Sequence, residues 1–183
     1  GLHFQFVKGG VFERGGSATN PIEAEAVADA VIRHATEHPS KTLGVGTFSV
    51  KQRDRILDEV ELHRRNRPDL EAFFSQGGAE PFFVKNLETI QGDERDIMIF
   101  SPVISKGSDV GSREWVEKPH NRVNVAVTRA RHSLYVISDI QFCATHCSGI
   151  LQKLAIYCRN INKLRESNSI GELELHKLLT LAG

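Results

Sequence analysis

Arginines supply all the charge in one short apolar segment of the chain. Residues 121–131 read NRVNVAVTRAR, with apolar residues at helical spacing, so we expect a helix with one face in a core. Arg122 and Arg129 lie seven positions apart and would share another face, with Arg131 at the helix end. Guanidinium groups suit phosphate and carboxylate ligands because they can donate two parallel hydrogen bonds. The segment therefore predicts either an anion site or a solvated helix face.

A second polar segment, residues 88–96, reads ETIQGDERD and carries a glycine and several carboxylates. Thr89 and Gln91 can donate hydrogen bonds to a phosphodiester or to a base edge. Gly92 would let the backbone approach a ligand closely, and a carboxylate in such a loop suits a ribose hydroxyl. The alternative is a solvated connector between two strands.

These two segments lie in a chain whose predicted strands and helices alternate. Such alternation favours an α/β fold with a mostly parallel sheet, whose ligands gather at the carboxyl ends of the strands. We therefore expect the loop at 87–96 and the arginine helix to lie at that edge. The expected strands are 3–8, 43–48, 82–86, 97–100 and 133–138. The expected helices are 20–38, with Asn20 as its cap, 49–66 and a short one at 69–74, and a polar loop is expected at 105–119.

Three segments, taken together, resemble the motifs of superfamily-one helicases. TIQGDERD at 89–96, with the strand after it, resembles motif V, and RVNVAVTRAR at 122–131 resembles motif VI. GVGTFSVKQ at 44–52 is similar to motif IV, and Asn20 with Glu23 resembles the helix entrance before it. The sequences of these motifs resemble the branch of the family that includes RNA-surveillance helicases and bacterial helicases of similar type. The resemblance covers residues 1–140.

The resemblance implies the second RecA-like domain of a two-domain motor. Its fold would be a three-layer, mostly parallel RecA-like sheet of the P-loop NTPase type, without the P-loop and with a helical C-terminal tail. In this family ATP lies between the two domains, and the second domain sends arginines to the γ-phosphate. Carried over by position, Arg129 would be the arginine finger, with Arg131 as a second catalytic arginine. Arg122 and Gln52 would be neighbours of the finger on the nucleotide.

The same resemblance implies roles for residues of the other motifs. Glu94 would hold the ribose of the nucleotide, beside Gly92. Single-stranded DNA or RNA would be contacted by Thr47, Phe48, Thr89 and Gln91.

The sequence lacks the pattern GxxxxGKS/T and a Walker B acidic pair. The resemblance therefore implies that a first RecA-like domain of the same polypeptide binds most of the ATP and the Mg2+. We expect the isolated chain to be inactive. The alternative hypothesis is a non-catalytic module, for nucleic-acid binding or protein interaction, that keeps the RecA-like fold. An upstream P-loop in the same gene would separate the two hypotheses.

Composition sets further bounds on the protein. The 183 residues have a formal net charge of zero, so any site for a polyanion must be local. Three cysteines and no signal-peptide pattern predict a reducing, cytoplasmic setting. No apolar run is long enough to span a membrane, and the start without Met suggests a fragment of a longer protein.

Residues 141–183 differ in character and are expected to form a helical extension. Cys143, His146 and Cys147, with Cys158, could be read as metal ligands, but zinc sites usually show two tight pairs. We therefore expect buried thiols and no metal. Residues 168–182 resemble the opening helix of very-short-patch-repair-like nuclease domains, which some bacterial helicases carry after motif VI.

Overall fold

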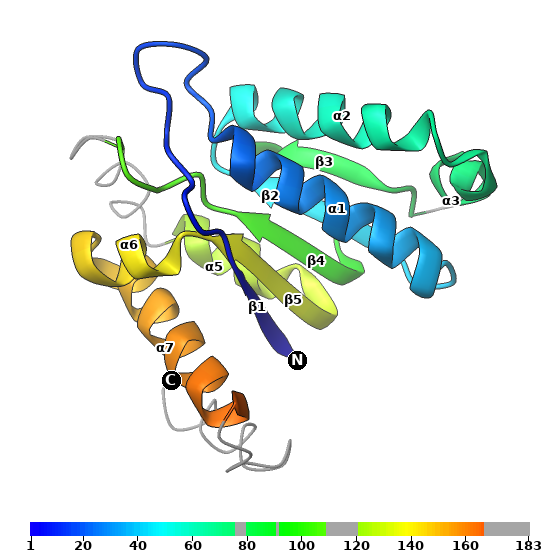
Figure 1. Cartoon of the computed structure of the whole chain (residues 1–183). Coiled ribbons are helices and arrows are strands. Elements are labelled where there is room, and N and C mark those ends of the chain that lie inside the picture. Colours follow the sequence, from blue (N-terminus) through cyan, green and yellow to red (C-terminus); the bar gives the residue numbers. More distant parts are fainter. Residues whose placement is uncertain (76–79, 91, 109–120, 167–183) are drawn as a thin grey trace.

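Five parallel strands form one sheet in the part of the chain that the structure describes. The computed structural model describes residues 1–75, 80–90, 92–108 and 121–166, without the side chains of 121–124 and 162–166. The strand order is β1-β5-β4-β2-β3, and every described pairing is parallel (Figure 1). The strands are β1 (Leu2–Phe6), β2 (Leu43–Thr47), β3 (Phe83–Asn86), β4 (Arg95–Ser101) and β5 (Ala130–Ser138). The predicted α/β fold with a parallel sheet is confirmed.

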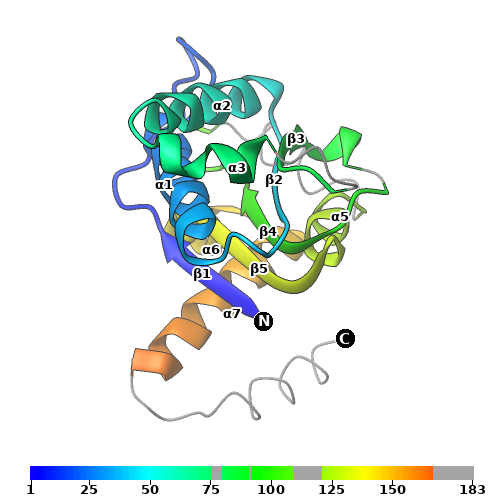
Figure 2. The ribbon, with the colours of Figure 1, turned by 90° about the vertical axis from the view of Figure 1, so that its right-hand side faces the viewer.

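Helices cover both faces of this sheet. One face carries α1 (Pro21–Glu37), α2 (Val50–Arg64), the 3-10 turn η1 (Pro68–Leu70) and α3 (Glu71–Phe74). The other face carries α5 (Asn121–Thr128), α6 (Ile140–His146) and α7 (Gly149–Glu166), with the 3-10 turn η2 (Leu87–Thr89) beside α5. Figure 2 shows α1 and α5 on opposite sides of the strands. The architecture is therefore the predicted three layers.

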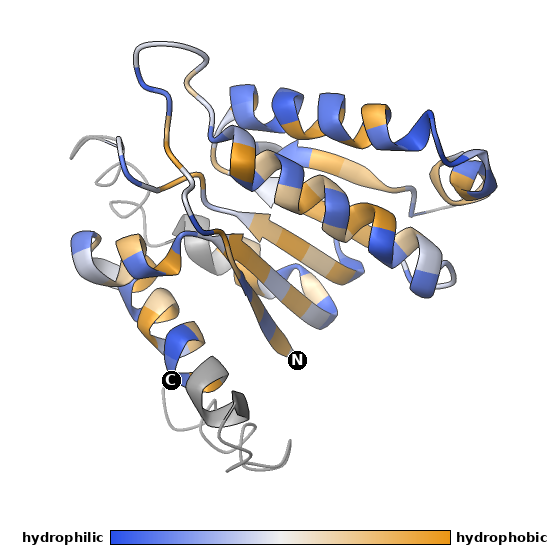
Figure 3. Cartoon of the chain, viewed as in Figure 1, coloured by the Kyte–Doolittle hydropathy of each residue, from blue (hydrophilic) through white to orange (hydrophobic). Residues whose placement is uncertain are grey.

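Each helical layer has its own hydrophobic core with the sheet. Val27 of α1 and Ile56 of α2 pack with Ile99 of β4 on one face. On the other face, Phe100 of β4 packs with residues of α6 and α7 such as Cys143 and Leu151. In Figure 3 the strands are mostly hydrophobic, whereas the outer turns of α2 are hydrophilic. The burial of apolar side chains on both faces explains the nearly continuous apolar sequence of β4.

Side-chain caps fix where the two long helices on the first face begin. The Asn20 carboxamide accepts a hydrogen bond from the Glu23 N–H at 3.2 Å, and Pro21 occupies the first turn of α1. Ser49 caps α2 through the N–H of Gln52 at 3.4 Å. Both predicted helix starts are thereby confirmed. Along the chain, β2 follows α1 and precedes α2, as expected.

The predicted arginine helix at 121–131 is too long at its carboxyl end. α5 ends at Thr128, and β5 begins at Ala130, three residues before the strand that we expected. The Arg95 N–H donates to the Arg129 carbonyl at 3.2 Å, so backbone groups that a helix would have used join the sheet instead. Arg129 therefore lies between helix and strand, and Arg131 lies on β5.

Two other expectations need adjustment. Residues 87–96 are not a plain loop, since they contain η2 and the first residues of β4. The described part of the expected extension, α6 and α7, packs into the same core as the sheet through Leu151, Ala155 and Cys158. Most of the expected loop at 105–119, and the helix and nuclease resemblance expected at 168–182, lie outside the described residues.

Candidate functional site

Charged side chains gather at the amino ends of three neighbouring strands. Residues 92–96 lead into β4, residues 129–132 lead into β5, and Thr42 directly precedes β2. Because these strands are parallel neighbours, their amino ends meet at one edge of the sheet, here called the amino-end edge. We had expected this site at the carboxyl ends. That expectation was wrong for Glu94 and Arg129, because these two residues directly precede β4 and β5.

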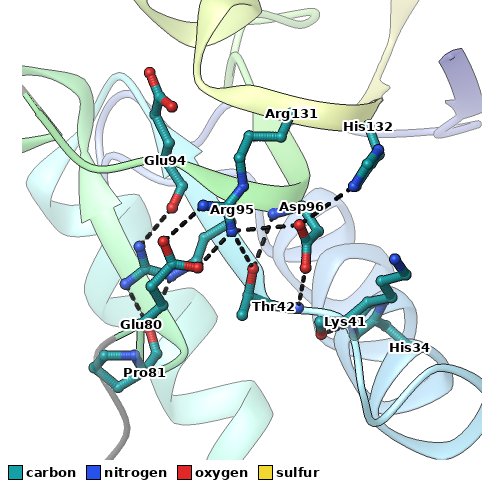
Figure 4. A network of polar contacts seen from close by, with 10 residues as sticks. All are labelled: His34, Lys41, Thr42, Glu80, Pro81, Glu94, Arg95, Asp96, Arg131 and His132. Atoms are coloured by element: carbon teal, nitrogen blue, oxygen red, sulfur yellow. Dashed lines mark hydrogen bonds and ion pairs between the residues drawn. The ribbon is translucent and has the colours of Figure 1, made fainter.

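An irregularity in the pairing of β4 with β5 shapes this edge. Arg95 pairs with Ala130 and Ile97 with Ser133, so β5 holds one residue more than β4 between the two pairs. Such a bulge changes the direction in which side chains point and is common next to active sites. Here it places both Arg131 and His132 opposite Asp96, as Figure 4 shows.

Asp96 is the centre of the resulting network. Its Oδ1 lies 3.3 Å from Arg131 Nη2 and 3.5 Å from His132 Nε2. Its Oδ2 accepts from the Thr42 N–H at 3.0 Å, while its own N–H donates to Thr42 Oγ1 at 2.9 Å. Partial burial works against the charged form, but the Thr42 hydrogen bonds and the charges of Arg131 and Lys41 lower the pKa of Asp96. Asp96 is thus a satisfied carboxylate.

Arg131 is held by a second carboxylate. Its Nη1 donates to Glu80 Oε1 at 2.7 Å, its Nη2 donates to Glu80 Oε2, and Nη2 also reaches Thr42 Oγ1 at 3.1 Å (Figure 4). The hydrogen bond from Arg131 lowers the pKa of Glu80, and the same bond raises the pKa of Arg131. Both terminal nitrogens of this guanidinium are therefore occupied by the protein itself.

The other charges beside the turn are also engaged. Arg95 is 4% exposed, and burial lowers its pKa. It donates to the Pro81 carbonyl at 2.8 and 3.1 Å and to the Glu94 carbonyl at 2.7 Å, over the ring of Phe83. Lys85 Nζ lies 2.7 Å from Asp93 Oδ2. Asp93 and Asp96 thus already neutralise cations and are poor candidates for Mg2+ ligands.

Arg129 and Glu94 differ from all these neighbours. The Glu94 side chain is 51% exposed, and Arg129 Nη1 lies 3.9 Å from Glu94 Oε1, too far for a hydrogen bond. Among the described residues, the Arg129 side chain donates one hydrogen bond, from Nη2 to Thr128 Oγ1 at 3.3 Å. Arg129 Nε is buried and finds no hydrogen-bond partner within the described part of the chain. These two side chains keep donor and acceptor capacity for a ligand.

The motif IV residues lie at the opposite edge and are buried. Gln52 accepts from the Asn20 N–H at 2.8 Å and donates to the Asn20 carbonyl at 3.1 Å. Gln52 follows the carboxyl end of β2, so the expectation that it neighbours Arg129 was wrong. Thr47 is fully buried, and Phe48 packs edge to face on Phe100 at 5.1 Å between centroids. In this conformation neither side chain is available to a nucleic acid.

The remaining predicted residues lie in the segment that joins the two edges. Thr89 is exposed at the end of η2, where its N–H donates to the capping Asn86 Oδ1 at 3.2 Å and its Oγ1 donates to the Asn86 carbonyl at 2.9 Å. Gly92 is exposed with a φ of 89°, a left-handed conformation that favours glycine. Gln91 and the side chain of Arg122 lie outside the described residues.

Sequence reasoning missed Glu80, Asp96 and Thr42. Their role depends on the bulge in β5, and no residue spacing in the sequence predicts that bulge. It also missed the buried carboxylate of Glu23, which accepts from Ser101 Oγ at 2.5 Å and from the Val103 N–H at 2.8 Å. The capping-box spacing of Asn20 and Glu23 was visible, but it pointed to a helix cap alone.

The described residues contain neither a candidate metal site nor a helix that could cross a membrane. No group of three histidine, cysteine or acidic side chains there could hold a metal ion, and Cys143, Cys147 and Cys158 are buried free thiols. None of the described helices combines the length and apolarity that crossing a bilayer demands.

Comparison with known proteins identifies the family. Residues 7–141 match a family described as the AAA domain, so the chain belongs to this family. An uncharacterized ATP-dependent helicase of Mycoplasma genitalium is 39% identical over 105 residues, which cover 54% of this chain and 9% of that protein. Its homologue in Mycoplasma pneumoniae is 34% identical over 136 residues, or 67% of this chain and 12% of that protein. These matches confirm the resemblance to ATP-dependent helicases.

Two further similarities are more distant. The NFX1-type zinc finger-containing protein 1 of Mus musculus is 33% identical over 85 residues, covering 46% of this chain and 4% of that protein. The chain thus spans at most 12% of the length of these curated relatives. A solved structure of the C-terminal domain of a possible DNA helicase from Lactobacillus plantarum WCFS1 superposes with a TM-score of 0.46. It shares 12% identity and covers 82% of this chain and 76% of that one.

Proposed function

We propose that the chain is the second motor domain of an ATP-dependent nucleic-acid helicase or translocase. Its amino-end edge would face a first RecA-like domain of the same polypeptide across a shared ATP site. The observation that carries the proposal is the pair Arg129 and Glu94. They lie 3.9 Å apart and keep hydrogen-bonding capacity, whereas Glu80, Asp96 and Arg131 beside them are joined in ion pairs. The family match and the helicase relatives support the same assignment.

Each residue of the pair has a distinct role in this proposal. Arg129 is the arginine finger, because its free donors can stabilise negative charge that develops on the transferred phosphoryl group. Glu94 accepts hydrogen bonds from the ribose hydroxyls, and the left-handed Gly92 brings the backbone of the turn close to the nucleotide. ATP supplies the phosphoryl group, and Mg2+ bound mainly by the first domain neutralises its oxygens.

Nucleic-acid binding belongs to the same proposal. The exposed Thr89 lies where the chain leaves the carboxyl end of β3, and Gln91 follows two positions later in the sequence. From there the chain crosses to Glu94 at the amino end of β4, so one short segment would touch both single-stranded DNA or RNA and the nucleotide. Residues 1–140 would form the motor domain and 141–183 its extension, in a cytoplasmic protein whose buried thiols stay reduced.

The test is nucleic-acid-stimulated ATP hydrolysis by the full-length protein, with DNA and RNA compared. Arg129→Ala should lower kcat by roughly three orders of magnitude while strand binding stays close to wild type. Arg33→Ala, which removes an exposed arginine of α1, is the matched control and should leave kcat unchanged. Turnover by Arg129→Ala near the wild-type rate would refute the finger. Strand binding without any turnover by the wild type would instead support the non-catalytic module.

A further inference from the structure

We infer that Arg131 is a positioning residue that acts through Glu80 and Asp96, and not a ligand of the nucleotide. This inference deepens the proposed function and rests on it for the reaction that is positioned. The four residues Thr42, Glu80, Asp96 and Arg131 form a latch at the amino-end edge (Figure 4). The latch fixes the turn at 92–96 from which Glu94 projects.

The first argument is the occupancy of the Arg131 guanidinium. A phosphate would use the same pair of terminal nitrogens that Glu80 already holds in a two-point contact. Nη2 additionally contacts Thr42 and Asp96 at 3.1 and 3.3 Å. To bind a phosphate, Arg131 would have to release partners on three separate segments. Arg129, two residues earlier, has nothing comparable to release.

The second argument is that the latch ties together segments that would otherwise be independent. Thr42 belongs to the approach to β2, Asp96 to β4, Arg131 to the bulge of β5, and Glu80 to the approach to β3. Reciprocal hydrogen bonds between Thr42 and Asp96, at 3.0 and 2.9 Å, join the first two. Arg131 then connects this pair to Glu80 and closes the network.

The third argument connects the latch to Glu94. Glu80 is followed by Pro81, whose carbonyl accepts two hydrogen bonds from Arg95. Arg95 in turn donates to the Glu94 carbonyl at 2.7 Å, and its N–H donates to the Arg129 carbonyl at 3.2 Å. Anchoring Glu80 therefore anchors the backbone of both proposed ligand-binding residues. Loss of the latch should displace them without removing them.

A double-mutant cycle in the full-length protein tests this inference. Arg131→Ala and Glu80→Ala should each lower kcat roughly tenfold, since small misplacements of reacting groups are costly, and should raise the KM for ATP by the same factor as each other because Glu94 is displaced with the turn. The double variant should be no worse than Arg131→Ala, because both changes break one contact. Arg131→Lys, which keeps the charge beside Glu80, should recover part of the rate. If the two losses multiply, or if Glu80→Ala retains the wild-type rate while Arg131→Ala does not, Arg131 acts on the nucleotide and the inference fails.

Hydrogen exchange supplies a readout that does not depend on turnover. Amides of residues 92–96 should exchange faster in Arg131→Ala and in Glu80→Ala, while β1 and α1 keep wild-type protection and so report that both variants are folded. Unchanged exchange at 92–96 in both variants would overturn the latch. If the wild type hydrolyses no ATP but both variants loosen the turn, the latch stands and the proposed function fails. Should either alanine variant unfold, Arg131→Lys and Glu80→Gln replace them in the same comparison.

Discussion

The two edges of the sheet use polar residues in opposite ways. At the amino-end edge the polar groups are charged and partly exposed, with 37% of the Arg131 side chain and 51% of the Glu94 side chain accessible. At the carboxyl ends, Asn20, Glu23 and Gln52 are fully buried. Asn20 is hydrogen-bonded to both other residues, and Glu23 also accepts from the Val103 N–H. At the first edge, Arg129 and Glu94 keep hydrogen-bonding capacity for a ligand. At the second edge, the three buried side chains use their hydrogen bonds to fix the neighbouring loops.

This difference shows how polar motif residues should be weighed. Gln52 belongs to a helicase-like motif, yet both ends of its carboxamide serve the Asn20 backbone. Arg131 belongs to another, yet its guanidinium serves Glu80. Membership of a motif does not distinguish a ligand-binding residue from one that supports it. Remaining hydrogen-bonding capacity at an exposed position does, and Arg129 with Glu94 meets that condition.

The largest effect should come from breaking the carboxyl-end edge at Gln52. Gln52→Leu keeps the side-chain volume but leaves the Asn20 N–H buried without a partner and leaves the Asn20 carbonyl with only the hydrogen bond from the Ala24 N–H. A buried N–H without a partner costs about 1–3 kcal/mol and a lost hydrogen bond about 1 kcal/mol, so we expect the 183-residue chain to lose roughly 3 kcal/mol of unfolding free energy. Urea denaturation measures this loss. The kcat of the full-length variant, below its unfolding temperature, should stay within about twofold of the wild type.

Lys51→Ala is the matched control for that variant. Lys51 is exposed on the same turn of α2, and removing it should change stability by less than about 0.5 kcal/mol. A Gln52→Leu protein with full stability but greatly reduced kcat would indicate that Gln52 contacts the nucleotide. The two edges would then not differ in the way described.

The fold could be derived largely from the sequence because local signals agreed with it. Asn20 and Ser49 indicated the starts of α1 and α2. The apolar residues of β4 indicated a strand that is covered on both faces. The boundary at Arg129 could not be derived. Residues 121–131 are compatible with helix throughout, and only the pairing of Ala130 with Arg95, distant in sequence, decides that a strand begins there.

The sequence predicted two residues of the candidate site, but not the residues that hold the neighbouring turn in place. Glu94 and Arg129 came from motifs, and the structure places them together. Their location at the amino ends was missed, since the general rule for parallel sheets favours carboxyl ends. Glu80 and Asp96 were missed because their function depends on a bulge. Thr47 and Phe48 were misjudged because burial is a property of the whole fold rather than of a motif.

Glu23 gives a second and smaller test of the carboxyl-end edge. Complete burial, opposed by hydrogen bonds from Ser101 and Val103, raises the pKa of Glu23 from 4.5 to about 7. The folded state therefore binds a proton more tightly than the unfolded state, so stability should fall as pH rises from about 4.5 to about 7. Between pH 5 and pH 8 this loss amounts to about 2 kcal/mol.

Glu23→Gln should remove that loss, because its carboxamide cannot ionise. The measurement is urea denaturation of the 183-residue chain at pH 5 and pH 8, compared as variant minus wild type. Burial lowers the pKa of His34, which favours stability at high pH, but this contribution is common to both proteins and cancels. Equal pH dependence in the two proteins would mean that Glu23 is not the buried titrating group.

The smallest expected effect sharpens the amino-end edge. If Glu94 accepts from the ribose, wild-type full-length protein should show a KM about tenfold higher for a nucleotide without ribose hydroxyls than for ATP. Glu94→Ala should raise the KM for ATP by a similar factor and abolish the discrimination, because the acceptor has gone. Glu88→Ala, which removes an exposed carboxylate six residues earlier, is the control and should preserve it. Because Glu94 is exposed and makes no hydrogen bond through its carboxylate in the described structure, its removal should leave unfolding free energy within about 0.5 kcal/mol. A Glu94→Ala protein that still discriminates the ribose, or one that loses stability instead, would show that this carboxylate is a structural partner of Arg129, as Asp96 is of Arg131.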